Sequence, residues 1–298
     1  MGRPPIITAL SVAAMIRPHI AAAHESGGAI GVTGPSAWDL AAMLLLAASG
    51  VMYLVGTIAL NRRGAYVRRV ERAAFWTGWV AMAAAVAPPM DSAAARAFSA
   101  HMAQHELLML IGAPLMIVGR PILPWLWALP ASLRPVAAAG MQGRSVSSLW
   151  RWLTLPALAW AVHGAVVWIW HAPVLYEAAL HSEAVHAFQH ATFVGTAVLF
   201  WWGLIYGRYG RAAYGASALF VFVTMVHTGA LGALLTFSNS SYYPLYRERA
   251  AAAGMDPIAD QQLAGLYMWI PSGLVLTIFA LALMLAWLSE SDRRSRAG

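Results

Sequence analysis

The chain has 298 residues, of which 60% are hydrophobic and only 10% are charged, as in polytopic helical membrane proteins and unlike soluble domains. Cysteine is absent, which excludes disulfides, thiolate metal ligands, iron–sulfur clusters and cysteine nucleophiles. The net charge of +7 does not indicate nucleic-acid binding, because the basic residues, all arginines, stand in short segments between apolar runs.

Residues 1–37 form either a signal-like segment or an external tail. Arg3 precedes a short apolar run from Ile6 to Ile16, and small residues follow it. The run is shorter than the roughly 20 apolar residues that a membrane-spanning helix needs. We therefore expect the membrane domain over 38–290, followed by a basic cytoplasmic tail at 291–298.

Seven apolar runs follow, each suited to a membrane-spanning helix. Segments containing proline, glycine or arginine separate them. In the sixth run, Gly229 and Gly232 form a small-residue stripe that favours close helix packing. The sequence predicts an all-α polytopic membrane bundle of seven transmembrane helices in the lipid bilayer. The runs are 38–60, 73–89, 101–120, 152–171, 184–206, 216–238 and 261–288.

The distribution of arginines predicts the orientation of these helices. Fourteen of the 19 arginines stand after the first, third and fifth runs or in the C-terminal tail. Cytoplasmic loops carry the excess of basic residues in membrane proteins. We therefore expect the N-terminus outside and the C-terminus in the cytoplasm.

Two histidine pairs open the third and fifth runs, His101 with His105 and His186 with His190. The i, i+4 spacing puts both imidazoles of a pair on one helix face. In the expected orientation, both pairs and His171 lie at the outer side of the membrane. A single histidine at a helix end is commonly an interfacial polar residue, but five from three helices favour a metal site. Imidazole binds copper, zinc, iron and nickel, so the cluster alone does not name the metal.

Other side chains near the same mouth, or deeper in the spans, are secondary candidates. Amides and carboxylates accept the second N–H of a metal-bound imidazole, and thioethers favour Cu(I). The simpler interpretations are helix capping for Asp260, packing for most methionines and interhelical hydrogen bonds for the mid-span histidines. The secondary candidates are His163, His227, Met102, Met225, Asp91, Asp260, Gln104 and Gln189.

An ordered set of sequence blocks resembles a known family. The blocks are HMAQHELLMLIGAPLM at 101–116, WIWHAPVLY at 168–176, HAFQHATFVGTAVLFWW at 186–202, HTGALGALLTFS at 227–238 and DQQLAGLYMWIP at 260–271. Together they resemble the CtaG family, the integral-membrane assembly factors of caa(3)-type cytochrome c oxidase. The resemblance covers about 38–290.

The resemblance implies a multi-pass protein of the bacterial plasma membrane that is not an enzyme. It would help to build an active haem–copper oxidase through copper, as Cu(I) or Cu(II). The implied partners are the catalytic subunit of cytochrome c oxidase and an extracytoplasmic copper chaperone. The positions that match the family blocks are His101, His105, His171, His186, His190, His227, Asp260 and Gln261.

Three functions are therefore open at this point. The first is a copper-binding assembly factor whose metal is held by the five outer histidines and moves by way of His163, Met225 and His227. The second is a membrane cytochrome, in which paired histidines are axial haem ligands. The third is a zinc-dependent membrane hydrolase, with three histidines and water on zinc and Asp260 or Asp91 as base. We place the copper assembly factor first.

Overall fold

All regular structure in residues 36–207 and 210–296, the parts of the chain that this computed structural model describes, is helical. The predicted all-α class is therefore confirmed for these residues. They fall within one compact unit, Pro35–Gly298. Our interpretation of the N-terminal tail or signal-like segment concerns residues that lie, except for the last two, outside the described ranges.

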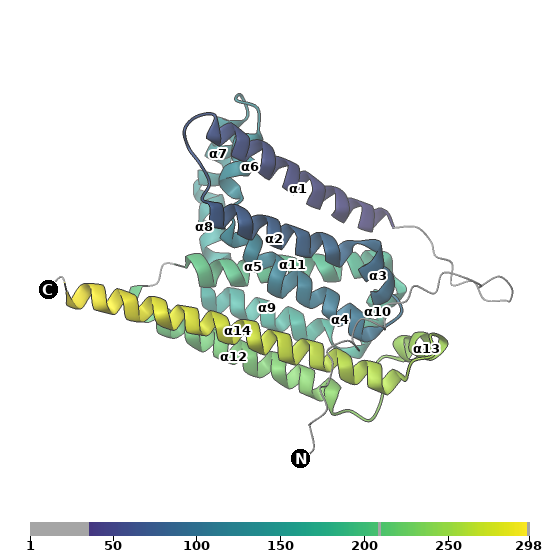
Figure 1. Cartoon of the computed structure of the whole chain (residues 1–298). Helices are drawn as coiled ribbons and strands as arrows, with labels where there is room; N and C mark the ends of the chain where they lie inside the picture. The colour runs from purple at the N-terminus through teal and green to yellow at the C-terminus, as the bar shows by residue number, and fades with distance from the viewer. Residues whose placement is uncertain (1–35, 208–209, 297–298) are drawn as a thin grey trace, which may run out of the picture. The chain divides into compact units, whose positions relative to one another are not determined.

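The helices vary widely in length and include several short ones between the long ones (Figure 1). In chain order they are α1 Ala37–Asn61, α2 Arg69–Val86, α3 Pro88–Ala94, α4 Phe98–Glu106, the π-helix η2 Leu107–Gly112, α5 Ala113–Val118, α6 Ile122–Ala128, α7 Arg134–Gln142, α8 Arg144–Leu153, α9 Pro156–Trp170, α10 Pro173–His181, α11 Glu183–Tyr206, α12 Gly210–Thr236, α13 Pro244–Ala252 and α14 Pro257–Ser295.

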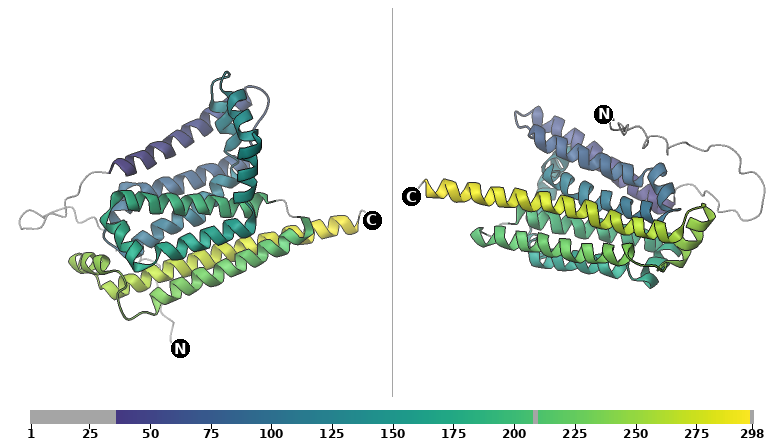
Figure 2. Two further views of the ribbon diagram at one scale, coloured as in Figure 1. Left: turned by 180° about the vertical axis from the view of Figure 1, so that it is seen from behind. Right: turned by 60° about the horizontal axis from the view of Figure 1, so that its bottom comes forward.

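The long helices run alternately in opposite directions (Figures 1 and 2). As a result, the short helices α3, α10 and α13 gather at one end of the bundle, where α4 and α14 begin. The short helices α6, α7 and α8 lie at the other end. The segments between the third and fourth apolar runs and between the sixth and seventh thus contain helices. Proline begins several of the short helices, as at Pro173 of α10 and Pro244 of α13, because its missing N–H is not needed in a first turn.

Five helical stretches among the described residues are long and apolar enough to cross a membrane. They are Ala37–Asn61, Phe98–Val118, Glu183–Tyr206, Ser217–Thr236 and Pro257–Ser289. A sixth arises if α8 and α9, which meet at a bend of 65°, count as one broken span. These stretches correspond to six of the seven predicted spans.

The remaining predicted span, 73–89, corresponds to α2, which differs from the others in composition. Its first turn carries Arg69, Glu71 and Arg72, so its apolar part is short. It ends at Val86 because Ala87, which precedes Pro88, takes an extended conformation. At the other end of the chain, α14 continues to Ser295, so the predicted basic tail is largely the last turns of this helix.

Large apolar side chains on the outer surfaces of α1, α12 and α14 are exposed, among them Leu44, Leu45, Phe222 and Leu274. A soluble protein rarely exposes such side chains over whole helices. Lipid is an apolar solvent for them, and the helices satisfy their own backbone hydrogen bonds. The described residues are therefore consistent with a multi-pass membrane protein.

The π-helix η2 interrupts the third predicted span. Pro114 has no N–H to donate to the carbonyl of residue 110, and the preceding amide of Ala113 bonds instead to Leu108 five residues back. The stretch remains helical from Phe98 to Val118. Histidines at the start of α4 are thereby held on a continuous span.

Glycines let α12 and α14 approach closely. A Cβ atom at Gly265 would lie 2.5 Å from the carbonyl oxygen of Gly232 and 2.7 Å from the amide nitrogen of Thr236. Gly232 in turn faces the carbonyl oxygen of Gly265. The expected role of Gly232 in close packing is confirmed, and its partner is on α14.

We predict that Gly265→Ala destabilises the bundle by about 1–3 kcal/mol, because the added methyl group meets backbone atoms that cannot move independently. Thermal unfolding of the detergent-solubilised protein measures the change. Gly195→Ala on α11 is the matched control, since nothing lies within 4 Å of a Cβ atom there. Equal unfolding midpoints for the two variants would contradict the predicted contact.

Candidate metal centre

Four of the predicted histidines converge at the end of the bundle where α4 and α11 begin. The Nε2 atoms of His101 and His105 are 2.9 Å apart, and those of His105 and His190 are 3.1 Å apart. The ring of His186 lies 4.4 Å from that of His190 and 5.4 Å from that of His101, centroid to centroid. The two helices are thus neighbours with their histidine faces turned toward each other. We call these four residues the histidine cluster.

The separations within the histidine cluster match those of metal ligands. Imidazole nitrogens bound to a metal at about 2.0 Å in a tetrahedral site lie about 3.3 Å from each other. One ring nitrogen from each of His101, His186 and His190 also lies within 4.8 Å of the others. His101 and His105 are buried, whereas His186 and His190 are partly exposed. The cluster therefore has an inner pair and an outer pair.

The tautomer of His101 is set by Tyr246 on α13. The Tyr246 hydroxyl donates its single proton to the carbonyl of Ala94 at 2.7 Å. Its oxygen therefore accepts from Nδ1–H of His101 at 2.5 Å, which leaves the lone pair on Nε2, facing the other histidines. Burial raises the pKa of Tyr246 well above its ordinary value, so the phenol keeps its proton.

Aromatic side chains from α4, α10, α13 and the residue that precedes α13 pack beside His101 and support it. The ring of Tyr176 lies 5.7 Å from that of His101, and it packs at 4.4 Å on Tyr243. Phe98 packs at 4.8 Å on Tyr243 and at 5.3 Å on Tyr246. We call these four aromatic residues the aromatic cap. The cap holds His101 in a closely packed aromatic setting.

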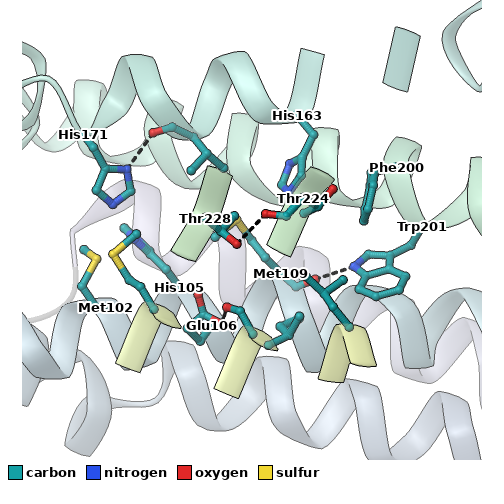
Figure 3. A pocket seen from close by; sticks show the side chains of 15 residues that line it. Met102, His105, Glu106, Met109, His163, His171, Phe200, Trp201, Thr224 and Thr228 are labelled. Atoms are coloured by element: carbon teal, nitrogen blue, oxygen red, sulfur yellow. Dashed lines mark hydrogen bonds between the residues drawn. The ribbon is translucent and has the colours of Figure 1, made fainter. Parts of the chain in front are cut away.

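His171, the fifth predicted ligand, lies apart from the histidine cluster. Its Nδ1–H donates to the carbonyl of Val167 at 2.7 Å, and its Nε2 is buried without a hydrogen-bond partner. Its side chain borders a cavity of about 50 Å³ that His105 also lines (Figure 3). His171 is thus connected to the cluster through the cavity.

The mid-span histidines do not contact the histidine cluster. His163 is buried, donates from Nδ1 to Thr196 Oγ1 at 3.0 Å, and lines the same cavity. His227 accepts a long hydrogen bond, 3.4 Å, from Trp168, and its Nε2 has no partner. His163 and His227 do not form a hydrogen bond with each other.

The two glutamines before the second histidine of each pair do not bond to an imidazole. Gln104 donates to the carbonyl of Ala85 at 2.9 Å and to Asp91 at 3.5 Å. The amide of Gln189 is fully buried with no hydrogen-bond partner. Burial raises the pKa of the Asp91 carboxyl, the nearby Asp39 raises it further, and the hydrogen bond from Gln104 lowers it. None of these groups hydrogen-bonds to a ring of the histidine cluster, so they do not orient its rings.

Asp260 positions the helix that carries the inner histidine pair. Its carboxylate accepts from the backbone N–H of Phe98 at 2.7 Å, and from the N–H and hydroxyl of Ser99 at 3.2 and 2.5 Å. The sequence suggested a cap for its own helix, but Asp260 on α14 caps the N-terminus of α4. The neighbouring Gln261 holds the chain before α13 through Tyr242 and Ser240.

Of the two methionine candidates, Met102 lines the cavity beside His105 and Met225 does not. Two methionines that were not selected, Met109 and Met268, line it as well. Met225 lies near Thr277, with a sulfur–hydroxyl distance of 3.9 Å.

Sequence reasoning missed two residues at this end of the bundle, Tyr246 and Glu106. Glu106 directly follows His105, lines the cavity, and accepts a hydrogen bond from Ser272 at 2.8 Å. A carboxyl group inside an apolar run is costly in a membrane and therefore indicates a functional residue. This feature of the sequence could have predicted a role for Glu106. No local pattern in the sequence indicated Tyr246, because it stands in a polar segment 145 positions away from His101 along the chain.

Comparison with known proteins identifies the family. The family model for cytochrome c oxidase caa3 assembly factors (Caa3_CtaG) matches residues 51–290, most of the chain. The chain belongs to this family. The resemblance that the sequence blocks suggested is confirmed.

Among curated relatives of this family member, the uncharacterized protein Mb0105 of Mycobacterium bovis is 27% identical over 260 residues, which cover 84% of the chain and 39% of that protein. The uncharacterized protein ML1998 of Mycobacterium leprae is 25% identical over 264 residues, covering 82% and 38%. The chain thus spans about two fifths of the length of these relatives. No solved structure matches it significantly.

We predict that Asp260→Ala lowers the free energy of unfolding by about 2–4 kcal/mol, because two buried N–H groups and a hydroxyl lose a charged acceptor. Asp256→Ala is the control, since that exposed carboxylate, which directly precedes α14, accepts only from the N–H of Ile258 in the first turn of that helix. The control should cost about 1 kcal/mol or less. Thermal unfolding in detergent compares them, and similar losses would contradict a special role for Asp260.

Proposed function

We propose that this assembly factor binds copper in the histidine cluster and helps to deliver it to the copper centre of cytochrome c oxidase. The observation that carries the proposal is the convergence of the Nε2 atoms of His101, His105 and His190, with the His101 lone pair directed inward by Tyr246. Imidazole suits several metals. Membership of an oxidase assembly family favours copper among them, because that oxidase contains copper.

We place the histidine cluster at the extracytoplasmic face of the bacterial plasma membrane. The arginine distribution supports an outside N-terminus and a cytoplasmic C-terminus. In this arrangement α2 and the bent α8–α9 pair complete seven spans with the five long helical stretches. The cluster then faces the compartment in which an extracytoplasmic copper chaperone would supply the metal and the catalytic subunit would receive it.

The arrangement of the ligands suits transfer by exchange. His186 and His190 are partly exposed and receive the metal first, while the buried His101 and His105 complete its coordination. Four imidazoles exceed the number that Cu(I) needs, so one ligand at a time can be released to an acceptor. The copper is cargo, and the proposed role requires no catalysis.

The geometry gives less support to the two other functions. The four imidazole centroids lie 4.4 to 5.8 Å apart in the pairs that contact, which leaves no slot for a porphyrin between them. The cavity below is about 50 Å³, far smaller than a haem. For a zinc hydrolase, Asp260 is a poor base because its carboxylate caps α4. The copper assembly factor remains the best-supported function.

We predict that His101→Ala combined with His190→Ala lowers copper affinity roughly tenfold or more, because two converging ligands are lost. Copper titration and elemental analysis of the detergent-solubilised protein measure the effect. His181→Ala is the control, since this exposed histidine pairs only with Glu177 and lies outside the cluster. Copper binding equal to wild type in the double variant would overturn the assignment. A Soret band or bound zinc would favour the other functions.

We predict that Tyr246→Phe weakens copper binding about 10- to 100-fold, the usual effect of removing a group that orients a ligand. Without the hydroxyl, Nδ1–H of His101 loses its acceptor and the ring loses its fixed tautomer. Tyr242→Phe is the control, because Tyr242 is exposed and its contact with Gln261 uses only its backbone. If both variants bind copper equally well, the tautomer argument is wrong.

A further inference from the structure

A cavity of about 50 Å³ lies next to the histidine cluster, between α4, α9, α12 and α14 (Figure 3). This volume holds a few water molecules or a bare ion, since one water needs roughly 10–15 Å³ on this measure. It is too small for an organic cofactor. His105 belongs to the histidine cluster and also lines the cavity, so the two are contiguous.

The cavity contains an imidazole nitrogen that is available as a ligand. His171 is 6% exposed, and its Nδ1–H is held by the carbonyl of Val167. Its Nε2 therefore carries the lone pair, and this atom is buried without a hydrogen-bond partner. The carbonyl of His171 itself accepts from the Tyr243 hydroxyl at 2.9 Å, which fixes the end of α9. The side chain points into the cavity toward Met102 (Figure 3).

Three methionines bring thioethers to the same cavity from different elements. Met102 is on α4, Met109 on η2 and Met268 on α14. Met102 and Met268 are almost completely buried. Methionine in a helical core usually serves for packing, and Met82, which is buried in the core without lining the cavity, is of this kind. The three cavity methionines differ because an unpaired imidazole nitrogen shares their space.

We propose that this cavity is a second metal site, which takes Cu(I) through Nε2 of His171 and the sulfur atoms of Met102 and Met268, with Met109 in reach. Thioether with imidazole is a soft donor set that selects Cu(I) over divalent metals. This proposal rests on the proposed function, because it takes copper to be the cargo. It gives Cu(I) a position beside the nitrogen-only histidine cluster, contiguous with it at His105.

The test is Cu(I) titration of the full-length detergent-solubilised protein without oxygen, against a chromophoric Cu(I) chelator, followed by copper X-ray absorption. Wild type is expected to bind two Cu(I), with both nitrogen and sulfur ligands. Met102→Leu combined with Met268→Leu conserves volume and is expected to lose one equivalent and the sulfur ligands. Met82→Leu combined with Met116→Leu, two methionines that do not line the cavity, is expected to behave as wild type.

Two further variants separate the sites. His186→Ala combined with His190→Ala is expected to lose the nitrogen-only copper and keep the one with sulfur ligands. His171→Leu keeps every thioether and is expected to weaken the sulfur-ligated copper at least tenfold, which tests the site should the methionine variant fail to fold.

Nitrogen-only copper in wild type would overturn the second site and leave the proposed function standing. Sulfur ligands that persist in the Met102→Leu, Met268→Leu variant would overturn it as well. If wild type binds no Cu(I), the proposed function fails together with this inference.

Discussion

The contact between Asp260 and the first turn of α4 is the interaction on which the candidate site depends. A buried carboxylate accepting backbone N–H groups at a helix N-terminus gains from both charge-assisted hydrogen bonds and the helix dipole. Because Asp260 stands near the start of α14, this contact couples the ends of two helices that are far apart in the sequence. It sets the depth of α4 and its rotation, and therefore the direction in which His101 and His105 point.

The second layer of support comes from the short helices at the same end. α10 and α13 contribute Tyr176, Tyr243 and Tyr246 to the aromatic cap, and these rings fill the space beside His101. The hydroxyl of Tyr246, one of the cap residues, links the carbonyl of Ala94 in α3 to the imidazole of His101 in α4. A connection that looks like a polar loop in the sequence thus becomes part of the site.

The donor atoms differ in kind between the histidine cluster and the neighbouring cavity. Partly exposed imidazoles come first, then buried imidazoles, and then a cavity in which His171 stands among methionines. Thioether donors in the cavity would favour Cu(I) more than the imidazoles of the cluster do, because thioethers are softer ligands. It also keeps bare charge away from lipid, because all these groups face the bundle interior.

The sequence by itself determined the helical membrane class, most of the spans, the family and the pairing of histidines on single helix faces. The class, the spans and the histidine pairing follow from composition, from apolar run length and from the 3.6-residue helical period, and the family follows from the ordered sequence blocks; all of these are read from the chain itself. Only the tertiary structure decided that α4 and α11 are neighbours, that Asp260 caps α4, that Tyr246 orients His101 and that His171 turns into a cavity with Met102. Those outcomes depend on how side chains from distant segments pack against one another, and no local pattern records which helix faces which.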